Sequence, residues 1–184
     1  TGTYSDITGV ERLQKYAGMF GFDSTSGIEL PESKPQISDA DSIRTAIGQG
    51  TNNFTATQLA RYVTTLANSG TCYDLSLVSE IKDIDGNVVY KNEHKVQNQL
   101  DFPVEQWNVV RQGMRQVVSV HTSSSALINQ INVAVAGKTG TAQQSEARPN
   151  HALFVSFAPY ENPEVTVTSV IPFGYSSGNA VELS

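Results

Sequence analysis

The hydrophobic pattern is clearest between residues 55 and 70, where apolar positions recur at the spacing of one helix face. That stripe consists of Leu59, Tyr62, Val63, Leu66 and Ala67. Thr55 and Gln58 stand just before it, three residues apart, as in a capping box that satisfies the first free N–H groups of a helix. Asn, Ser and Gly at 68–70 are typical of a helix end. We therefore predict an amphipathic helix with this stripe buried.

Two further helices are predicted on either side of this one. Thr8 and Glu11 fit a second capping box, and apolar residues follow at helical spacing as far as Phe20, before Gly21 ends the pattern. Pro103 opens the other helix, because its fixed φ suits a first turn. The predicted buried face of that helix is Val104, Trp107, Val110, Met114 and Val117.

Shorter elements complete the first two thirds of the chain. Short helices are expected at Asp41–Ala46 and near Ser124–Gln130. Val78–Ile84 and Val88–Tyr90 are rich in β-branched residues and flank Asp85-Gly86-Asn87, a turn sequence typical of a β-hairpin.

The last third changes to strand-like runs separated by short loops that contain Gly, Pro or Asn. These runs are Val133–Thr141, Ala152–Ala158 and Val165–Ile171. The connections are short enough for antiparallel neighbours. Helices followed by a three-stranded antiparallel sheet indicate an α+β fold. We expect a helical part with an inserted hairpin at about residues 1–131 and a sheet part at about 132–184.

Composition and charge exclude several classes of function. The net charge is −6 and Lys and Arg form no cluster, which argues against a nucleic-acid-binding protein. Cys72 is the single cysteine, so no internal disulfide forms, and no Cys/His spacing suggests a zinc site. Cys72 is interpreted as a small residue in a loop or at a strand start. No apolar run has membrane-spanning length, and the chain, which starts without Met or a leader, is interpreted as a piece of a longer protein.

The stretch Lys138-Thr139-Gly140-Thr141 carries the candidate chemistry, at the end of the first apolar run. A strand that borders a cleft offers free backbone groups to an extended peptide. Lys138 would supply a positive charge shielded from water, where it attracts a substrate carboxylate strongly. Thr139 and Thr141 can donate hydroxyl hydrogen bonds to the same carboxylate. Gly140 lets a substrate backbone come close.

Other segments accompany this motif in a fixed order along nearly the whole chain. They are Tyr16–Phe22 with Gly27–Pro31, Ala46–Gly50 with Thr57–Ala60 and Leu66–Gly70, Gly113-Met114 with Val117-Val118, and His151–Pro159. Together they resemble the penicillin-binding protein and serine β-lactamase superfamily, which uses the motifs Ser-x-x-Lys, Ser-x-Asn and Lys-Thr-Gly. The closer resemblance is to the C-terminal portion of the transpeptidase domain of class B penicillin-binding proteins.

The resemblance implies a peptidoglycan D,D-transpeptidase, in which a serine ester forms with release of D-alanine and an amine then resolves it. Lys138 and Thr141 would be catalytic, the backbone N–H of Thr141 as one of two oxyanion-hole donors. Lys138, Thr139, Gly140 and Thr141 would bind substrate. Implied partners are peptidoglycan stem peptides, β-lactam antibiotics and other cell-wall synthesis proteins. The implied location is the extracytoplasmic face of the bacterial membrane, with an anchor outside this chain and no metal or organic cofactor.

The nucleophilic serine and the Ser-x-Asn motif are expected to lie N-terminal to this chain, so that it is inactive alone. Ser79 and Lys82 fit Ser-x-x-Lys, but they lie in a strand pattern, where residues three apart point to opposite faces. The Ser-x-Asn pattern is matched by Ser177-Gly178-Asn179, and a variant of it by Tyr160-Glu161-Asn162. Both stretches follow Lys138 instead of preceding it, and both are expected in loops. The three histidines lack a triad context, so each is interpreted as a surface or strand-packing residue. For His151, which opens the strand next to Lys138, lining the cleft is the alternative. The histidines are His94, His121 and His151.

Two alternatives to the transpeptidase remain open at this stage. One is a serine β-lactamase or β-lactam sensor domain, and the other is a non-catalytic scaffold with the same fold. The residues Asn179–Ser184 resemble the first turn of a helix that covers the sheet in the family. With the rest of that helix and two front strands missing, we expect exposed apolar surface or a compensating partner contact.

Overall fold

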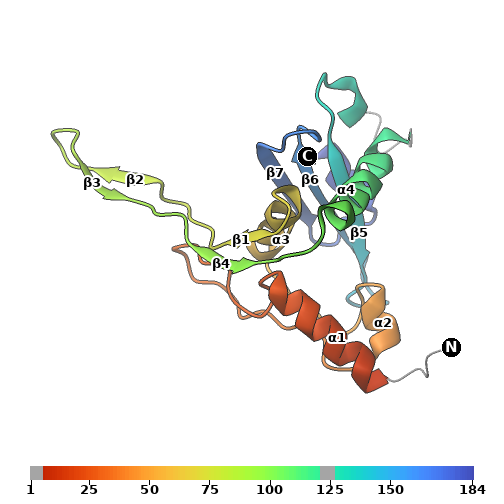
Figure 1. Ribbon diagram of the computed structural model, residues 1–184. Coiled ribbons are helices and arrows are strands. Elements are labelled where there is room, and N and C mark those ends of the chain that lie inside the picture. The colour runs from red at the N-terminus through yellow and green to blue at the C-terminus, as the bar shows by residue number, and fades with distance from the viewer. Residues whose placement is uncertain (1–5, 121–126) are drawn as a thin grey trace.

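The computed structural model describes residues 6–120 and 127–184, as a helical part, a projecting arm and a three-stranded sheet (Figure 1). The helices are α1 (Asp6–Met19), α2 (Ser42–Ala46), α3 (Ala56–Ala67), α4 (Val104–Ser119) and α5 (Ser177–Glu182), with a 3-10 turn at Ile128–Gln130. The strands are β1 (Thr71–Tyr73), β2 (Glu80–Lys82), β3 (Val88–Lys91), β4 (Val96–Gln99), β5 (Ala136–Ala142), β6 (His151–Ala158) and β7 (Val165–Ile171). This arrangement confirms the predicted α+β class.

The main sheet has the order β5-β6-β7 and is antiparallel throughout. The third predicted run coincides with β7, whereas β5 begins at Ala136, three residues later than predicted. Ala136 pairs with Phe157 near the end of β6, and the next residues of that strand are Ala158 and Pro159. Pro159 has no N–H to continue the ladder. The regular ladder of β5 therefore begins at Ala136, and beyond Pro159 the N–H of Tyr160 still donates to the carbonyl oxygen of Ala134.

The two faces of this sheet pack against different helices. On one face, Phe157 and Ala136 join Val63 and Leu66 of α3 and Trp107 of α4 in one apolar cluster. On the other face, Ala152 and Phe154 of β6 pack with Ala180 and Val181 of α5 and with Val118 at the end of α4. Residues of β6 alternate between the two clusters, as a strand requires. The sheet is thus covered on both faces.

The buried face of α4 differs from the prediction. Val104 and Val110 are exposed, and Val118 is buried where Val117 was expected. The stripe that faces the core includes Arg111, whose guanidinium lies over the rings of Phe157 and Tyr160. A cation in the middle of the buried stripe hid its true position in the sequence, because a guanidinium packed on aromatic rings behaves as part of the core.

The helix starts are mixed in outcome. The capping box of α3 is present, with the side chain of Thr55 accepting from the N–H of Gln58. Asp41 caps α2 in the same way through the N–H of Arg44. The first helix, α1, begins at Asp6, so Thr8 lies inside it and does not start it. Of the helix predicted near 124–130, residues 121–126 lie outside the described part, and Ile128–Gln130 form only a 3-10 turn.

The predicted hairpin forms the tip of an arm that projects away from the helices and the sheet (Figure 1). Gly86 in its turn has a φ of +86°, which a residue with a side chain rarely adopts. At the base of the arm, β1 pairs with β4, a ribbon that the sequence did not predict because β4 (Val-Gln-Asn-Gln) is mostly polar. Cys72 lies in β1, fully buried, as the interpretation of a small residue at a strand start expected.

Apolar side chains remain exposed at one end of the sheet. Val165 and Val167 of β7 and Ile131 are exposed, and they line a cavity of about 190 Å³ together with Phe157. Exposed apolar surface was expected because a face of the sheet would lack its helix; instead α5 packs on that face, and the exposed apolar side chains lie at one end of the sheet. None of the described helices is both long and apolar enough to cross a lipid bilayer.

Gly137 offers a test of how tightly β5 is packed. A Cβ at this position would overlap the ring of Phe154 and lie 2.9 Å from the carbonyl oxygen of Val155. We expect Gly137→Ala to lower the free energy of unfolding by about 1–3 kcal/mol, measured by urea denaturation. The control is Gly113→Ala in α4, which meets nothing within 4 Å and should be neutral or stabilising, by up to about 1 kcal/mol. Equal effects at the two sites would contradict the packing described.

Candidate active site

The four residues of the Lys-Thr-Gly-Thr motif lie in β5, at one edge of the sheet. Lys138 is paired with Val155 of β6, and Gly140 with Leu153. The other edge of β5 has no strand partner among the described residues. The backbone groups on that edge are not used in a strand ladder, which leaves the edge open to strand addition by an extended ligand.

The motif divides its side chains between the two faces of the sheet. Lys138 shares the face of its partner Val155, which packs toward α3. Thr139 and Thr141 are paired with Phe154 and Ala152, on the face that packs toward α5. The ammonium and the two hydroxyls therefore reach the same ligand only if the ligand lies along the strand edge.

Lys138 is exposed, where the sequence interpretation expected a position shielded from water. Its Nζ donates to the carbonyl oxygen of Thr139 at 2.7 Å, and no carboxylate of the described residues lies within 4 Å of it. In water, an ion pair at 4 Å gives only about 1 kcal/mol, against several when the pair is screened less. The residues described here leave Lys138 as an available but weak anion-binding group.

A cavity of about 500 Å³ lies beside the end of β5. It is lined mainly by apolar side chains, among them Phe54, Leu59, Leu153 and Val170. His151, at the start of β6, lines the same cavity, and its Nδ1 accepts from the N–H of Phe173 at 3.1 Å. His151 therefore lies at a hollow next to the motif strand, as its position in the sequence suggested.

The other sequence matches lie outside β5. Lys82 is in the exposed strand β2 and pairs with Glu80 at 2.7 Å, so Ser79 and Lys82 do not share a helix face. Ser177 begins α5, so this match was wrongly expected in a loop, and Asn179 donates to the carbonyl oxygen of Gly174. His94 is exposed beside Tyr73, and His121 lies outside the described residues. No group of His, Cys, Asp and Glu in residues 6–120 and 127–184 is arranged to hold a metal ion.

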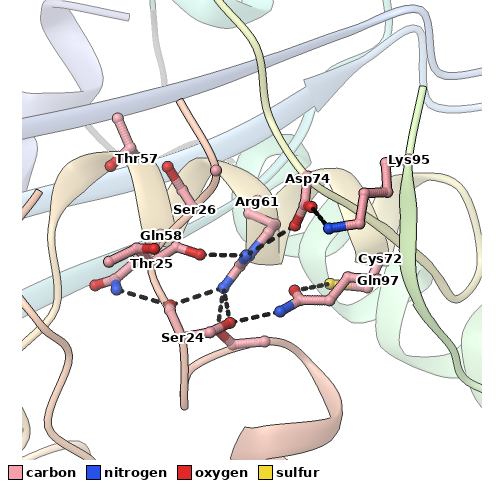
Figure 2. A network of polar contacts seen from close by, with 12 residues as sticks. Ser24, Thr25, Ser26, Thr57, Gln58, Arg61, Cys72, Asp74, Lys95 and Gln97 are labelled. Atoms are coloured by element: carbon pink, nitrogen blue, oxygen red, sulfur yellow. Dashed lines mark hydrogen bonds and ion pairs between the residues drawn. The ribbon is translucent and has the colours of Figure 1, made fainter. Parts of the chain in front are cut away.

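The most elaborate polar cluster is one that the sequence did not reveal (Figure 2). Arg61 of α3 is 1% exposed and donates to the carbonyl oxygens of Gly21, Ser24 and Thr25. Asp74 lies 3.8 Å from this guanidinium and 2.8 Å from the ammonium of Lys95. The sequence shows only an arginine within a helix of mixed apolar pattern. It does not indicate that backbone carbonyl groups 36 to 40 residues earlier surround this arginine.

Two glutamates hold the loop that follows this cluster. Glu32 accepts from the N–H and hydroxyl of Ser26 and from the hydroxyl of Thr57. Desolvation raises the pKa of Glu32, but these hydrogen bonds outweigh it and the pKa is lowered. Glu29 accepts from the hydroxyl of Ser76 and the N–H of Leu77 at the base of the arm. These bonds, the one from Ser76 first, lower the pKa of Glu29 to about 2.

The thiol of Cys72 lies near the same cluster, 3.7 Å from the carbonyl oxygen of Phe20 and 3.8 Å from the side-chain oxygen of Gln97. Burial raises its pKa, so the thiol stays neutral and unreactive. This agrees with a structural role for the residue.

Residues 4–182 match the family described as the penicillin-binding protein transpeptidase domain. The chain belongs to this family. Penicillin-binding protein 2B of Streptococcus pneumoniae is 30% identical over an alignment of 196 positions, which covers 98% of this chain and 29% of that protein. The peptidoglycan D,D-transpeptidase MrdA of Haemophilus influenzae is 30% identical over an alignment of 210 positions, which covers 96% of this chain and 32% of that protein. Both relatives belong to the class B penicillin-binding proteins, as the motif and its flanking segments indicated.

Solved penicillin-binding proteins have the same fold as this chain. The structure of penicillin-binding protein 2B from Streptococcus pneumoniae strain R6 superposes with a TM-score of 0.80 at 27% identity, over 99% of this chain and 32% of that one. Penicillin-binding protein A of M. tuberculosis, solved as an imipenem acyl-enzyme complex, gives 0.79 at 25% identity, over 96% and 42%. The chain spans about a third of the length of penicillin-binding protein 2B and of MrdA.

The buried guanidinium of Arg61 should be essential for stability. Arg61→Met keeps much of the side-chain volume but removes the donor of the Thr25 carbonyl oxygen and one donor each from the Gly21 and Ser24 carbonyl oxygens, so we expect a loss of about 3 kcal/mol of unfolding free energy. The matched control is Arg44→Met, because Arg44 is exposed and its ion pair with Asp41 is long, at 3.8 Å, and open to water. This substitution should change stability by less than about 0.5 kcal/mol. Urea denaturation measures both, and a loss below about 1 kcal/mol for Arg61→Met would contradict this role.

The carboxyl group of Glu29 should titrate near pH 2, as followed by NMR of its side-chain carbon. Because its pKa is depressed in the folded chain, its contribution to stability is complete above the ordinary value of 4.5 and is lost as the pH falls toward 2. Ser76→Ala removes the largest cause, so the pKa of Glu29 should move back toward 4.5. Ser33→Ala, an exposed change in the same loop, should leave it unchanged. A pKa of Glu29 near 4.5 in the unsubstituted chain would contradict the hydrogen bonds from Ser76 and Leu77 to this carboxylate.

Proposed function

We propose that this chain supplies the Lys-Thr-Gly wall of a peptidoglycan D,D-transpeptidase and forms the C-terminal part of its penicillin-binding domain. The observation that carries the proposal is the free edge of β5, which bears Lys138, Thr139, Gly140 and Thr141 in a chain of this family. The relative named peptidoglycan D,D-transpeptidase supports the reaction, and the relative with an imipenem acyl-enzyme supports acylation by β-lactams.

In this proposal the acyl donor, a stem peptide, lies along the outer edge of β5 as an added strand. Its carboxylate meets Lys138 from one face and the hydroxyls of Thr139 and Thr141 from the other. The backbone N–H of Thr141 stabilises the oxyanion of the tetrahedral intermediate. Lys138 is exposed, so we include in the proposal that residues from another part of the protein cover it. They lower the local dielectric constant and strengthen the attraction of Lys138 for the carboxylate.

The nucleophile is proposed to be a serine outside these 184 residues. This serine forms an ester with the peptide as the terminal D-alanine leaves, and an amine of a neighbouring peptide then takes the acyl group and frees the serine. The chain by itself is then inactive. We also propose an extracytoplasmic location at the bacterial membrane, with stem peptides, β-lactams and other cell-wall synthesis proteins as partners. These proposals rest on family membership and on the motif.

Labelling with a fluorescent penicillin tests the proposal in two steps. The 184-residue chain should give no covalent band on denaturing electrophoresis. A chimaera is then made in which this chain replaces the aligned residues of penicillin-binding protein 2B from Streptococcus pneumoniae. This chimaera should be labelled. A covalent band from the chain alone would place the nucleophile inside it and refute that part of the proposal.

Lys138→Ala in the chimaera should slow acylation about a hundredfold, a loss typical of one electrostatic group of an acyl-transfer site. The control is Lys82→Ala in the arm, which should leave the rate unchanged. Circular dichroism establishes that each protein is folded. A folded chimaera that is not labelled would favour a non-catalytic scaffold, and equal rates for the two lysine variants would exclude β5 as the binding wall.

A further inference from the structure

The tip of the arm has an unusual surface for a two-stranded ribbon. Every residue from Ser79 to Lys91 is exposed. The apolar side chains among them are 44–101% exposed: Ile81, Ile84, Val88, Val89 and Tyr90. A two-stranded ribbon is marginally stable in water unless a further strand or a helix packs against it. The exposed apolar side chains and the two free strand edges therefore invite a partner at the arm.

The two edges of the ribbon are not equivalent. Ile81 pairs with Tyr90, and Lys82 pairs with Val88, so Val89 of β3 is an extra residue that forms a bulge. Bulges bend and twist a strand and disturb pairing at its edge. The strand β2 has no extra residue. Its outer edge is therefore the better template for another strand.

The sequence of β2 and its neighbours is complementary to itself when reversed. We propose that β2 pairs with the β2 strand of a second copy of this chain, antiparallel about a two-fold axis at Ile81. Glu80 then lies opposite Lys82 of the second copy, and Ser79 lies opposite its Asp83. Ile81 meets the same residue of the other copy. Since Glu80 and Lys82 are already 2.7 Å apart within one chain, the two-fold axis builds a quartet of alternating charges.

The apolar residues agree with the same register, because Val78 lies opposite Ile84 of the second copy. A register centred on Glu80 or on Lys82 would instead place like charges opposite each other and set Ile81 against Ser79 or Asp83. Opposite charges across a strand pair are stabilising and like charges are destabilising. Only the register centred on Ile81 pairs charge with opposite charge and apolar with apolar residues.

A lipid surface is a poorer partner for the arm. Asp83 and Asp85 flank Ile84 at the tip, and anionic lipids repel carboxylates. A second copy satisfies both the charges and the free backbone groups. The contact is small, so the dimer is expected to be weak and reversible. The proposal does not depend on the proposed enzymatic function.

Disulfide trapping measures this contact directly in the 184-residue chain. Ile81→Cys puts two thiols opposite each other across the axis, so covalent dimers should form in a glutathione buffer and be visible on non-reducing electrophoresis. Val89→Cys is the matched control, as exposed and on the other strand, and should be trapped at least tenfold more slowly. The native Cys72 is buried and should give no dimer. Equal trapping at positions 81 and 89 would overturn the proposal.

Charge reversal tests the register. In the Ile81→Cys background, K82E gives Glu opposite Glu, and E80K with K91E gives Lys opposite Lys while keeping the pair of residues 80 and 91 within the arm. Each variant alone should be trapped about tenfold more slowly. A mixture of the two, with different tags, should recover the original rate as heterodimers, because opposite charges meet again. Trapping that ignores the reversals, or a mixture that fails to recover in chains folded by circular dichroism, would refute this register.

Discussion

The ladder between β5 and β6 is the constraint on which the rest of this structure depends. It joins seven residue pairs, from Ala136 with Phe157 to Ala142 with His151. Because neighbouring residues of a strand point to opposite faces, this register alone decides that Lys138 lies on the α3 side and both threonines lie on the α5 side. A shift by one residue would exchange these faces. The apolar residues of β6, fixed in two cores, prevent that shift.

Polar groups set the position of the loop before α3, since that loop has few apolar residues to bury. Arg61 donates to three backbone carbonyl groups of this loop, and Glu32 accepts from an N–H and two hydroxyls. Such groups stabilise a fold mainly because each is costly to leave unpaired. The loop, α3 and the base of the arm are in this way joined into one unit, on which β6 and β7 pack through α3.

The chain combines a well-packed body with two surfaces that are open. The edge of β5 and the edge of β2 both expose backbone groups, but they differ in chemistry. The first carries a lysine, hydroxyls and a glycine beside an apolar hollow, which suits an extended peptide with a carboxylate. The second carries alternating charges around an isoleucine, which suits another strand of the same sequence. An unpaired edge is a site of association, and the side chains beside it select the partner.

The sequence by itself determined the features that depend on neighbours along the chain. The capping box at Thr55 and Gln58, the bounds of β7, the hairpin turn at Gly86 and the placement of the Lys-Thr-Gly residues in a strand were all predicted, because caps, alternation and turns are local. Only the tertiary structure decided the burial of Arg61, the face of α4 around Arg111, the pairing of β1 with β4 and the exposure of Lys138. Each of these depends on groups far away in the chain, whose carbonyls, rings or strands no local pattern could locate.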